Sequence, residues 1–228
     1  PAPPVGRIAL AVMAKVPVAG QVKTRLCPPL TPDAAAALAR CFLLDRLDQL
    51  RGVPGADALV AFAPPEEEAA LREIVPPETR LVPQVGADLG GRLDRLLTGL
   101  LAEGYPGAIA LDADSPTLPT AYLREACQHL RNASADVVLG PCEDGGYYLI
   151  GLRAPAPALF VEVPWSTAAV LAETITRARD LGRRLRLLPP WFDVDRGEDL
   201  DRLHASDVVP GAFRPARTLA YLAGATGP

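Results

Sequence analysis

Two pairs of aspartates, each separated by one residue, are the clearest chemical feature of the sequence. Asp112 and Asp114 follow the apolar run 108–111, and Asp193 and Asp195 precede an acidic stretch that should open a helix. Carboxylate oxygens at a strand end suit a hard divalent cation shared with a diphosphate. Acids also stabilise a helix N-terminus, which is the structural alternative for both pairs. Position after a buried strand favours a metal for the first pair, whereas a role for the second in the same site needs tertiary closure.

A basic loop is the second feature. The chain has 23 basic residues but only two lysines, Lys15 and Lys23, and both lie in the stretch MAKVPVAGQVKTRL with Gly20 between them and Arg25 after them. Backbone N–H groups of a glycine loop can approach phosphate oxygens closely, and Lys and Arg neutralise them. The loop matches neither a Walker A motif nor a GxGxxG fingerprint. It is a candidate polyphosphate cradle, with an ordinary surface loop as the alternative.

The stretch GPCEDGGYYLIGL contains a predicted tight turn. Gly145 and Gly146 permit positive φ angles, and a β-hairpin is the plain structural interpretation. Tyr147 and Tyr148 either contact a sugar or base or fill the core. Asp144, in the same turn, is our candidate for an acid or base that orients an acceptor.

The stretch PWST offers a further candidate contact. Ser166 or Thr167 is expected to cap a helix that runs to residue 181. Trp165 in front of them is either a sugar platform or a buried core residue, and the second is the commoner case.

Nucleophilic triads are disfavoured by the sequence. The only histidines are His129 and His204, and neither has a serine or cysteine partner at a suggestive spacing. The four cysteines form no CxxC pair and are expected to be reduced, intracellular thiols. Cys27 and Cys142 lie in candidate site loops, where they can be simple core residues.

Apolar runs and turn residues predict an alternation of strands and helices. Strands are expected at 7–14, 57–63, 80–84, 108–111, 135–139, 147–152 and 184–188. Helices are expected at 32–50 (capped by Thr31), 65–74, 90–101, 120–130, 166–181 and 198–204. This pattern predicts an α/β three-layer sandwich with a mostly parallel central sheet. Ligands bind at the carboxyl ends of such strands, which selects the loops 15–25, 86–92, 112–117, 141–147 and 189–195.

Size and charge limit the remaining possibilities. The 228 residues, 49% of them hydrophobic, suit one domain with a core at about 7–205 and an irregular tail at 206–228, with one helical turn near 218–222. A net charge of −4 argues against a dedicated nucleic-acid binder. No apolar run approaches the roughly 18 residues of a membrane span, so we expect a cytoplasmic protein.

Six stretches in order resemble a known family. They are AKVPVAGQVKTRL, GADLGGRL, DADSPTLP, LGPCEDGGYYLIGL, PWST and DVDRGEDL, between about residues 8 and 203. Together they resemble the GT-A-fold nucleotide-diphospho-sugar transferase superfamily, in particular the small bacterial glycosyltransferases described as transferase 1 associated with radical-SAM and selenodomain proteins. The resemblance implies the GT-A fold.

A wider resemblance rests on Asp114-Ser115-Pro116 and on Asp195 shortly before Glu-Asp-Leu. It is to nucleotidyltransferases acting on phospholactate, molybdenum cofactor and sugar acids. It implies that a metal, Mg²⁺ or Mn²⁺, lies between Asp114 and Asp195, with Asp112 and Asp193 as supporting acids. It also implies that the basic loop holds the donor phosphates. The sequence departs from these relatives at two places. Arg196-Gly197 follows Asp195, where relatives commonly have Thr after the Asp, and Leu111-Asp112 precedes Ala113-Asp114, where Gly-Ser or Gly-Thr is more usual.

We therefore predict a metal-dependent glycosyltransferase that moves a sugar from a nucleotide-diphospho-sugar donor to a small acceptor. The alternative is a nucleotidyltransferase that releases pyrophosphate, which the basic loop favours because a triphosphate needs more cations. A non-catalytic nucleotide-binding module is disfavoured by acids at both strand ends. The nucleobase, the sugar, the acceptor and the oligomeric state stay open.

The predicted site residues fall into four groups. The metal is expected at Asp112, Asp114, Asp193 and Asp195. Asp114 and Asp144 are the catalytic candidates. The donor phosphates or nucleotide are expected at Lys15, Gly20, Lys23, Arg25 and Arg92. The acceptor or sugar is expected at Gly145, Gly146, Tyr147, Trp165, Ser166 and Thr167.

Overall fold

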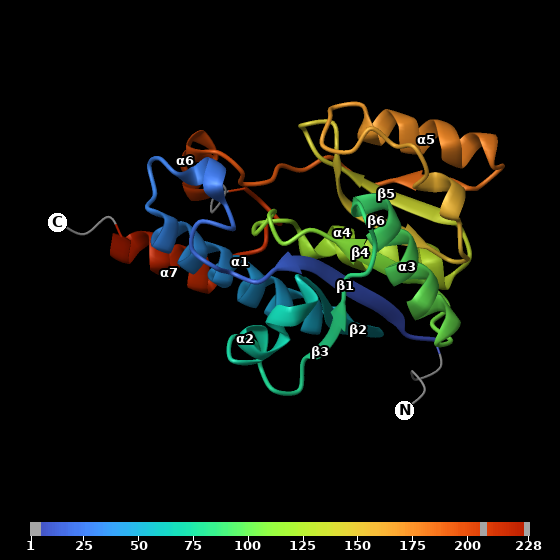
Figure 1. Cartoon of the computed structure of the whole chain (residues 1–228). Coiled ribbons are helices and arrows are strands. Elements are labelled where there is room, and N and C mark those ends of the chain that lie inside the picture. The colour runs from blue at the N-terminus through green and yellow to red at the C-terminus, as the bar shows by residue number, and fades with distance from the viewer. Residues whose placement is uncertain (1–5, 206–208, 226–228) are drawn as a thin grey trace.

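The computed structural model describes residues 6–205 and 209–225 and contains a seven-stranded sheet (Figure 1). The strand order is β3-β2-β1-β4-β6-β5-β7, and β6 alone runs antiparallel, to both β4 and β5. The strands are β1 (Ile8–Lys15), β2 (Ala56–Ala63), β3 (Arg80–Pro83), β4 (Ala108–Leu111), β5 (Val137–Pro141), β6 (Tyr147–Leu152) and β7 (Leu185–Leu187). The predicted mostly parallel sheet is confirmed.

Helices cover both faces of the sheet, which confirms the three-layer arrangement. They are α1 (Pro32–Arg51), α2 (Glu68–Arg72), α3 (Leu89–Ala102), α4 (Thr120–Arg131), α5 (Val170–Asp180), α6 (Gly197–Ala205) and α7 (Ala216–Ala225), with short 3-10 turns η1 (Thr24–Leu26), η2 (Pro65–Glu67) and η3 (Pro157–Leu159). Buried side chains of α1, α2 and α4 pack on one face. Those of α3, η3 and α5 pack on the other.

The central strand β1 shows why a continuous apolar run forms this sheet. Ile8, Leu10 and Val12 face α1 and α4, whereas Ala9 and Ala11 face α3, and all five are fully buried. A strand with helices on both faces has no solvated side, so its sequence cannot alternate with polar residues. The strand then delivers Lys15 to the carboxyl edge of the sheet, beside the end of β2.

The start of α5 differs from the prediction. The helix begins at Val170 rather than Ser166, because Ser166 has a left-handed backbone with φ of 63°. Thr167 does not cap α5. Its hydroxyl donates to the Pro164 carbonyl at 2.7 Å and accepts from the backbone N–H of Ala169 at 3.3 Å, which makes a local turn.

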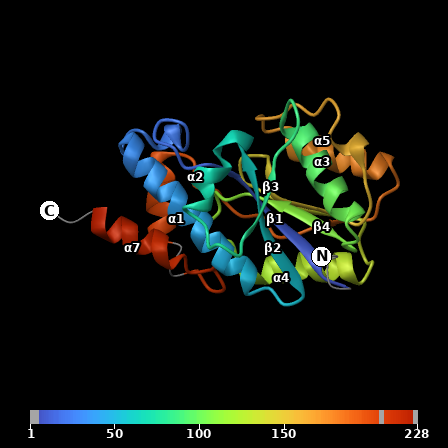
Figure 2. The same cartoon turned by 60° about the horizontal axis from the view of Figure 1, so that its bottom comes forward.

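The C-terminal segment also differs from the prediction of an irregular tail. Ala216–Ala225 forms helix α7, which lies beside α1 in both views (Figure 1 and Figure 2). The buried Asp45 carboxylate on α1 accepts from the backbone N–H groups of Arg217 and Thr218 at 3.1 and 2.8 Å. These N–H groups have no partner within their own helix, so Asp45 fastens the segment to α1. Residues 206–208 and 226–228 of the predicted tail lie outside the described residues.

Within the described ranges, the helices are too short or too polar to span a lipid bilayer.

Candidate active site

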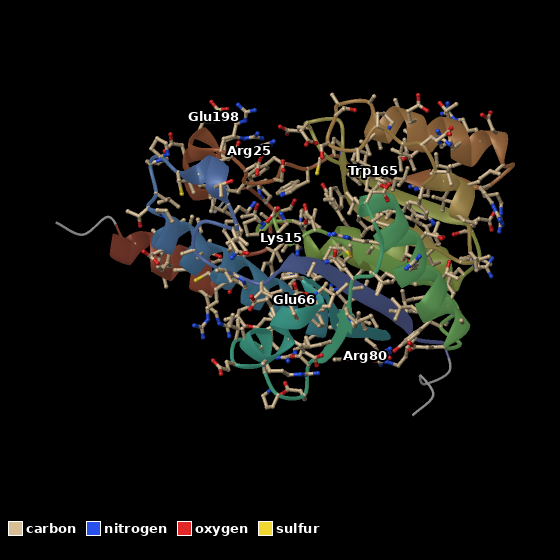
Figure 3. All side chains as sticks on the ribbon, in the orientation of Figure 1. Lys15, Arg25, Glu66, Arg80, Trp165 and Glu198 are labelled. Carbon is tan, nitrogen blue, oxygen red and sulfur yellow. The ribbon has the colours of Figure 1, made fainter. Side chains whose placement is uncertain are left out.

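A cavity of about 370 Å³ opens at the carboxyl ends of β1 and β4. Four of the five predicted donor residues line it: Lys15, Lys23, Arg25 and Arg92. Asp114 and Asp195 line it as well. Lys15 at the end of β1 and Arg25 in η1 are labelled in Figure 3. The predicted convergence of separate loops at this edge of the sheet is therefore present.

Gly20 does not line the cavity. It has a φ of 76°, and an added Cβ atom would meet nothing within 4 Å. Its place in the turn reflects the left-handed backbone that glycine adopts without cost. Gly20 therefore shapes the basic loop rather than leaving space for a neighbouring group.

Lys23 lies between the two acidic segments, residues 112–114 and 193–195. Its ammonium pairs with the Asp114 carboxylate at 2.8 Å and donates to the Val194 carbonyl at 2.7 Å. The side chain is only 5% exposed and passes over the Phe42 ring. Its backbone is left-handed, with a φ of 49°, a conformation that costs energy for a side chain with a Cβ atom and is found mainly where the surroundings enforce it.

Arg25 pairs with the second acidic segment in a more open way. Its guanidinium lies 2.8 Å from the Asp195 carboxylate, and 68% of the Arg25 side chain is exposed. The backbone at Asp195 is fixed by Asp199, whose carboxylate accepts from the N–H groups of Asp195 and Arg196 at 3.0 and 2.7 Å. The Arg196-Gly197 departure therefore keeps a capped helix start, supplied by Asp199.

The two acidic segments meet, which the sequence spacing could not show. The backbone N–H of Val194 donates to the Asp114 carbonyl at 2.8 Å. Trp191, just before the second segment, exchanges backbone hydrogen bonds with Pro141 and Glu143. The loops after β4, β5 and β7 are thus tied together at one edge of the sheet.

Asp112 lies beneath the cavity rather than in its lining. Its carboxylate accepts from the Ser115 hydroxyl at 2.6 Å and lies 3.4 Å from the guanidinium of Arg46, which is fully buried. Burial raises the pKa of Asp112 to about 7, and the positive charge of Arg46 opposes that rise. Arg46 also donates to the Ser115 carbonyl at 2.6 Å, so the pair shapes the loop that presents Asp114.

Sequence reasoning missed Arg46. The residue lies on α1 three positions after the buried Leu43 and one before the buried Leu47, among the apolar residues of that helix. An arginine among the buried residues of a helix could have indicated a buried ion pair, because buried charges are rare without partners.

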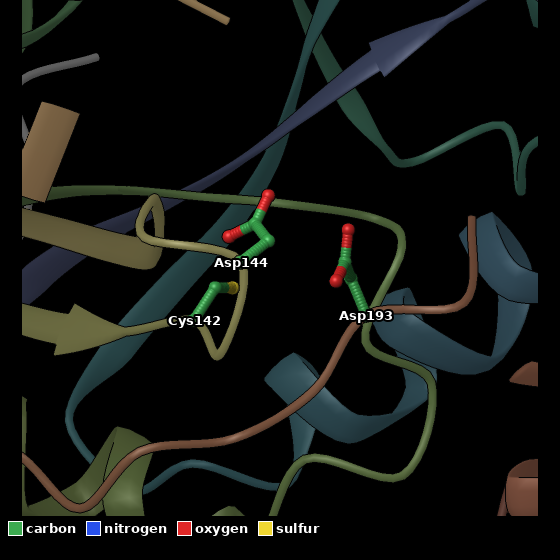
Figure 4. Close-up of side chains that lie close together, drawn as sticks. All are labelled: Cys142, Asp144 and Asp193. Atoms are coloured by element: carbon green, nitrogen blue, oxygen red, sulfur yellow. The ribbon is translucent and has the colours of Figure 1, made fainter. Parts of the chain in front are cut away.

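Asp193 points to a different neighbour from Asp195. Its carboxylate lies close to the Asp144 carboxylate and to the Cys142 thiol (Figure 4). Burial and the negative charge of Asp144 raise the pKa of Asp193 to about 6. Asp144 itself is held by the Gly146 N–H, which donates to its carboxylate at 2.8 Å.

The glycine turn forms the predicted hairpin between β5 and β6. Gly145 has a φ of 89°, and a Cβ atom there would lie 2.3 Å from the Ala168 carbonyl oxygen. Leu171 donates its backbone N–H to the Gly145 carbonyl at 2.9 Å. Glycine at this position therefore lets the turn lie directly against the segment that carries PWST.

The two tyrosines mainly fill the core. Tyr148 is fully buried and donates its hydroxyl to the Pro189 carbonyl at 3.0 Å. Gly140 makes room for its ring, because a Cβ atom there would lie 2.2 Å from it. Tyr147 packs against the core beneath α5, and its hydroxyl is buried. Neither tyrosine lines the cavity at the ends of β1 and β4.

Trp165 lies beside the start of α3 (Figure 3), where Gly90 leaves space for the indole ring. A Cβ atom at Gly90 would lie 2.8 Å from the indole nitrogen. Ser166 and Thr167 follow as exposed residues on the same segment. The residues that contact the glycine turn are Ala168 and Leu171, which follow on the same segment, and Trp165, Ser166 and Thr167 do not line the cavity.

His129 has a serine partner that the sequence spacing did not suggest. Its Nδ1 lies 2.8 Å from the Ser134 hydroxyl, and its Nε2 lies 3.4 Å from Glu125. His129 and Ser134 lie at the C-terminal end of α4. The cavity lies near the other end of this helix, at Ala113 and Asp114 after β4. Ser134 also caps the C-terminal helix end through its backbone N–H to the His129 carbonyl, so the contact is structural.

Comparison with known proteins places the chain among bacterial relatives. A family described as "uncharacterized protein conserved in bacteria (DUF2064)" matches residues 46–167. A candidate nucleotide-diphospho-sugar transferase from Desulfovibrio desulfuricans G20 has 30% identity and a TM-score of 0.88, covering 95% of this chain and 94% of that one. None of the curated proteins matches significantly.

Two more distant structures share the fold. A CMP:2-keto-3-deoxy-manno-octonic acid synthetase complexed with CTP has 14% identity and a TM-score of 0.56, covering 87% of this chain and 97% of that one. Rv0371c from Mycobacterium tuberculosis H37Rv, in complex with manganese, has 19% identity and a TM-score of 0.50, covering 86% and 97%. At these identities the likeness establishes the fold alone.

Proposed function

This chain belongs to the DUF2064 family of bacterial proteins, and we propose that it is a divalent-cation-dependent glycosyltransferase that uses a nucleotide-diphospho-sugar donor and a small acceptor. The observation that carries the proposal is the cavity at the strand ends, where cations and carboxylates from separate loops converge. The candidate nucleotide-diphospho-sugar transferase with 30% identity supports the donor class. The motif likeness to the radical-SAM and selenodomain group supports glycosyl transfer in particular.

The charge of this cavity, called the donor cavity from here on, suits a diphosphate. Four cationic side chains and two carboxylates line it, which leaves an excess of two positive charges. Lys15 is exposed at the end of β1, and Arg92 lies on the first turn of α3. Fixed cations at a leaving diphosphate lower the barrier because they are already oriented before charge develops. Lys15 and Arg92 therefore bind the donor phosphates in our proposal.

The implied divalent cation fits the acids on one condition. Asp114 and Asp195 both face the cavity from segments joined by a hydrogen bond, but each carboxylate is paired with a cationic side chain, Lys23 or Arg25. When these two side chains turn to the donor phosphates, the carboxylates are free to hold Mg²⁺ or Mn²⁺. The bound cation would neutralise charge on the departing diphosphate.

The acceptor side of the site is proposed at the glycine turn. Asp144 is exposed there, and its carboxylate is oriented by the Gly146 N–H. A carboxylate in this position can accept a hydrogen bond from an acceptor hydroxyl and align it with the sugar. Alignment of bound reactants can lower a barrier by several kcal/mol, so a strong dedicated base is not required. The exposed Ser166 and Thr167 are available for further contacts with the acceptor.

A binding screen tests this proposal. UDP-, GDP- and TDP-sugars are titrated into the protein by calorimetry, with and without Mn²⁺. We expect one donor class to bind, and to bind more tightly with the cation. If no nucleotide sugar shows cation-dependent binding, glycosyl transfer from such donors is ruled out.

Nucleotidyl transfer is the second candidate, and one observation favours it. If Lys23 and Arg25 both leave their acids, four cations face the donor, which also suits a triphosphate. The two reactions differ in their products. Pyrophosphate released from a nucleoside triphosphate with Mg²⁺ and a phosphorylated acceptor would identify this reaction and overturn glycosyl transfer.

A further inference from the structure

Three side chains beside the donor cavity share one small space. The Cys142 thiol and the carboxylates of Asp144 and Asp193 place one ligand atom each within 4.8 Å of the others (Figure 4). Asp144 and Cys142 come from the turn after β5, and Asp193 comes from the segment after β7. Two parts of the chain about fifty residues apart therefore supply one potential ligand set.

Backbone hydrogen bonds join the two segments that carry these side chains. The Trp191 N–H donates to the Pro141 carbonyl at 3.0 Å, and the Glu143 N–H donates to the Trp191 carbonyl at 3.1 Å. This bridge fixes Cys142 opposite the segment that leads to Asp193. The Asp144 carboxylate is fixed separately by the Gly146 N–H. The segments that carry the potential metal ligands are thus joined before any metal ion binds, which reduces the entropy lost on binding.

The thiol of Cys142 gives independent evidence that a metal ion binds here. Cys142 is 8% exposed, and among the described residues no hydrogen bond to its sulfur is found, although it is directed at two carboxylates. Most buried cysteines instead pack among apolar groups as small hydrophobic residues. A thiol placed against two negative charges is poorly satisfied unless a cation joins them.

The surroundings favour a positively charged occupant. The adjoining cavity of about 350 Å³ contains six acidic side chains and three arginines, an excess of three negative charges. Its lining acids are Glu143, Asp144, Asp193, Asp195, Glu198 and Asp199, and its arginines are Arg25, Arg196 and Arg202. A concave surface with one dominant sign of charge concentrates counter-ions, and here those are cations. The exposed Asp144 gives such an ion a path from solvent.

We propose that Cys142, Asp144 and Asp193 bind a thiophilic divalent transition metal such as Zn²⁺. One sulfur and two oxygen donors suit a borderline metal better than Mg²⁺, which prefers oxygen ligands alone. On binding, the S–H bond of Cys142 breaks, its proton passes to solvent, and the thiolate sulfur bonds to the metal. Three protein ligands leave a coordination position open for water or a ligand oxygen.

This metal site goes beyond the proposed function. The cation expected at the donor diphosphate uses Asp114 and Asp195, and the Cys142 site does not depend on a nucleotide. Asp144 is the one residue that it shares with the proposed transfer reaction, where the same carboxylate aligns the acceptor. Asp193, which the family resemblance counts as a supporting acid for the donor cation, is assigned here to Cys142 and Asp144 instead. The two sites can therefore be tested apart.

Cobalt titration tests the proposal directly. Co²⁺ is added to the full-length protein without nucleotide, because Co²⁺ occupies Zn²⁺ sites and a thiolate ligand gives a charge-transfer band in the near ultraviolet. We expect the band in the parent, reversed by added Zn²⁺, and its loss in Cys142→Ser. Asp144→Asn, a change at an exposed residue, should weaken Co²⁺ binding at least about tenfold, because losing a direct ligand costs no less than losing a supporting one.

The matched control is Cys41→Ser, a half-buried cysteine on α1 that is not part of the group, and it should keep the band. Thermal unfolding checks that each variant is folded. A Co²⁺ complex without the band in the parent, or Co²⁺ affinity unchanged in both Cys142→Ser and Asp144→Asn, would overturn the proposal. Donor binding with Mg²⁺, measured in parallel, would stand or fall separately and so distinguishes this failure from failure of the proposed function.

Discussion

At the scale of single residues, the ammonium of Lys23 occupies the space between the two acidic segments of the site. It contacts Asp114 and the Val194 carbonyl at 2.8 and 2.7 Å. In the proposed function, a divalent cation at Asp114 displaces this ammonium, which then becomes available to the donor phosphates. The proposal therefore couples cation binding to phosphate binding through one side chain.

The Lys23→Met variant tests that coupling. It removes the competing charge and keeps the length of the side chain over Phe42. In calorimetry without nucleotide, we expect Mn²⁺ to bind up to about fivefold more tightly, because an ion pair whose carboxylate is 47% exposed contributes up to about 1 kcal/mol. Lys15→Met is the matched control, since Lys15 lines the same cavity without an ion pair among the described residues. Equal Mn²⁺ affinity in the two variants would show that Lys23 does not compete with the cation.

Arg46 gives a second residue-scale prediction. Burial raises the pKa of Asp112 to about 7 in the folded protein, well above its ordinary value near 3.8, and Arg46 opposes that rise. The folded state therefore binds more protons than the unfolded chain between about pH 4 and 7, and Asp112 lowers stability as the pH rises through this range. Removal of Arg46 raises the pKa of Asp112 further and extends the loss of stability to higher pH.

We expect Arg46→Met to destabilise the protein by about 3 kcal/mol at pH 8, because it leaves a buried charge without its partner. The loss should be smaller at pH 5.5, where Asp112 is protonated in the variant. Denaturant unfolding at both pH values measures this, with the exposed Arg95→Met as control. A loss of stability that is the same at both pH values would mean that Arg46 acts through packing alone.

Sequence analysis located the chemistry-bearing residues of the cavity but not how they pair. Residue type and position after a buried strand are visible in the sequence, so Asp114, Lys15, Lys23 and Arg25 could be placed at the strand ends. The pairing of Lys23 with Asp114 spans 91 residues, and the contact of Cys142 with Asp193 depends on the bridge at Trp191. Such contacts follow from tertiary closure, which spacing along the chain does not determine.

At the scale of elements, apolar runs predicted the strands well, because a strand buried on both faces leaves a continuous pattern. The start of α5 was misplaced by four residues, because the left-handed Ser166 and the local turn of Thr167 imitate a capping sequence. Helix α7 was largely missed, because its N-terminus is capped by Asp45 from α1, far away in the sequence.

The Asp45→Ala variant tests the attachment of α7. Loss of a capping carboxylate costs about 1–2 kcal/mol, and we expect that loss in the free energy of unfolding. Amide hydrogen exchange should increase in residues 216–225 before the rest of the chain. Asp33→Ala, an exposed acid on the same helix, should change stability by less than about 0.5 kcal/mol. Unchanged exchange in α7 would mean that apolar contacts alone hold it.

At the scale of the whole molecule, two cavities of opposite charge adjoin at the carboxyl edge of the sheet. The donor cavity has an excess of two positive charges and the neighbouring one an excess of three negative charges, with Arg25 and Asp195 lining both. The antiparallel β6 places the glycine turn beside this edge, between the ends of β4 and β5. The fold class followed from the sequence, whereas the strand order that creates the adjoining cavities did not.

The central claim is that Asp114 holds a divalent cation at the diphosphate of a bound nucleotide sugar. Calorimetric titration of the best-binding nucleotide sugar into the parent and into Asp114→Asn, with and without Mn²⁺, tests it most directly. We predict that Mn²⁺ tightens donor binding in the parent and that Asp114→Asn loses this gain by at least about tenfold, as expected for loss of a metal ligand. An Asp114→Asn variant in which Mn²⁺ tightens donor binding as much as in the parent would contradict the claim.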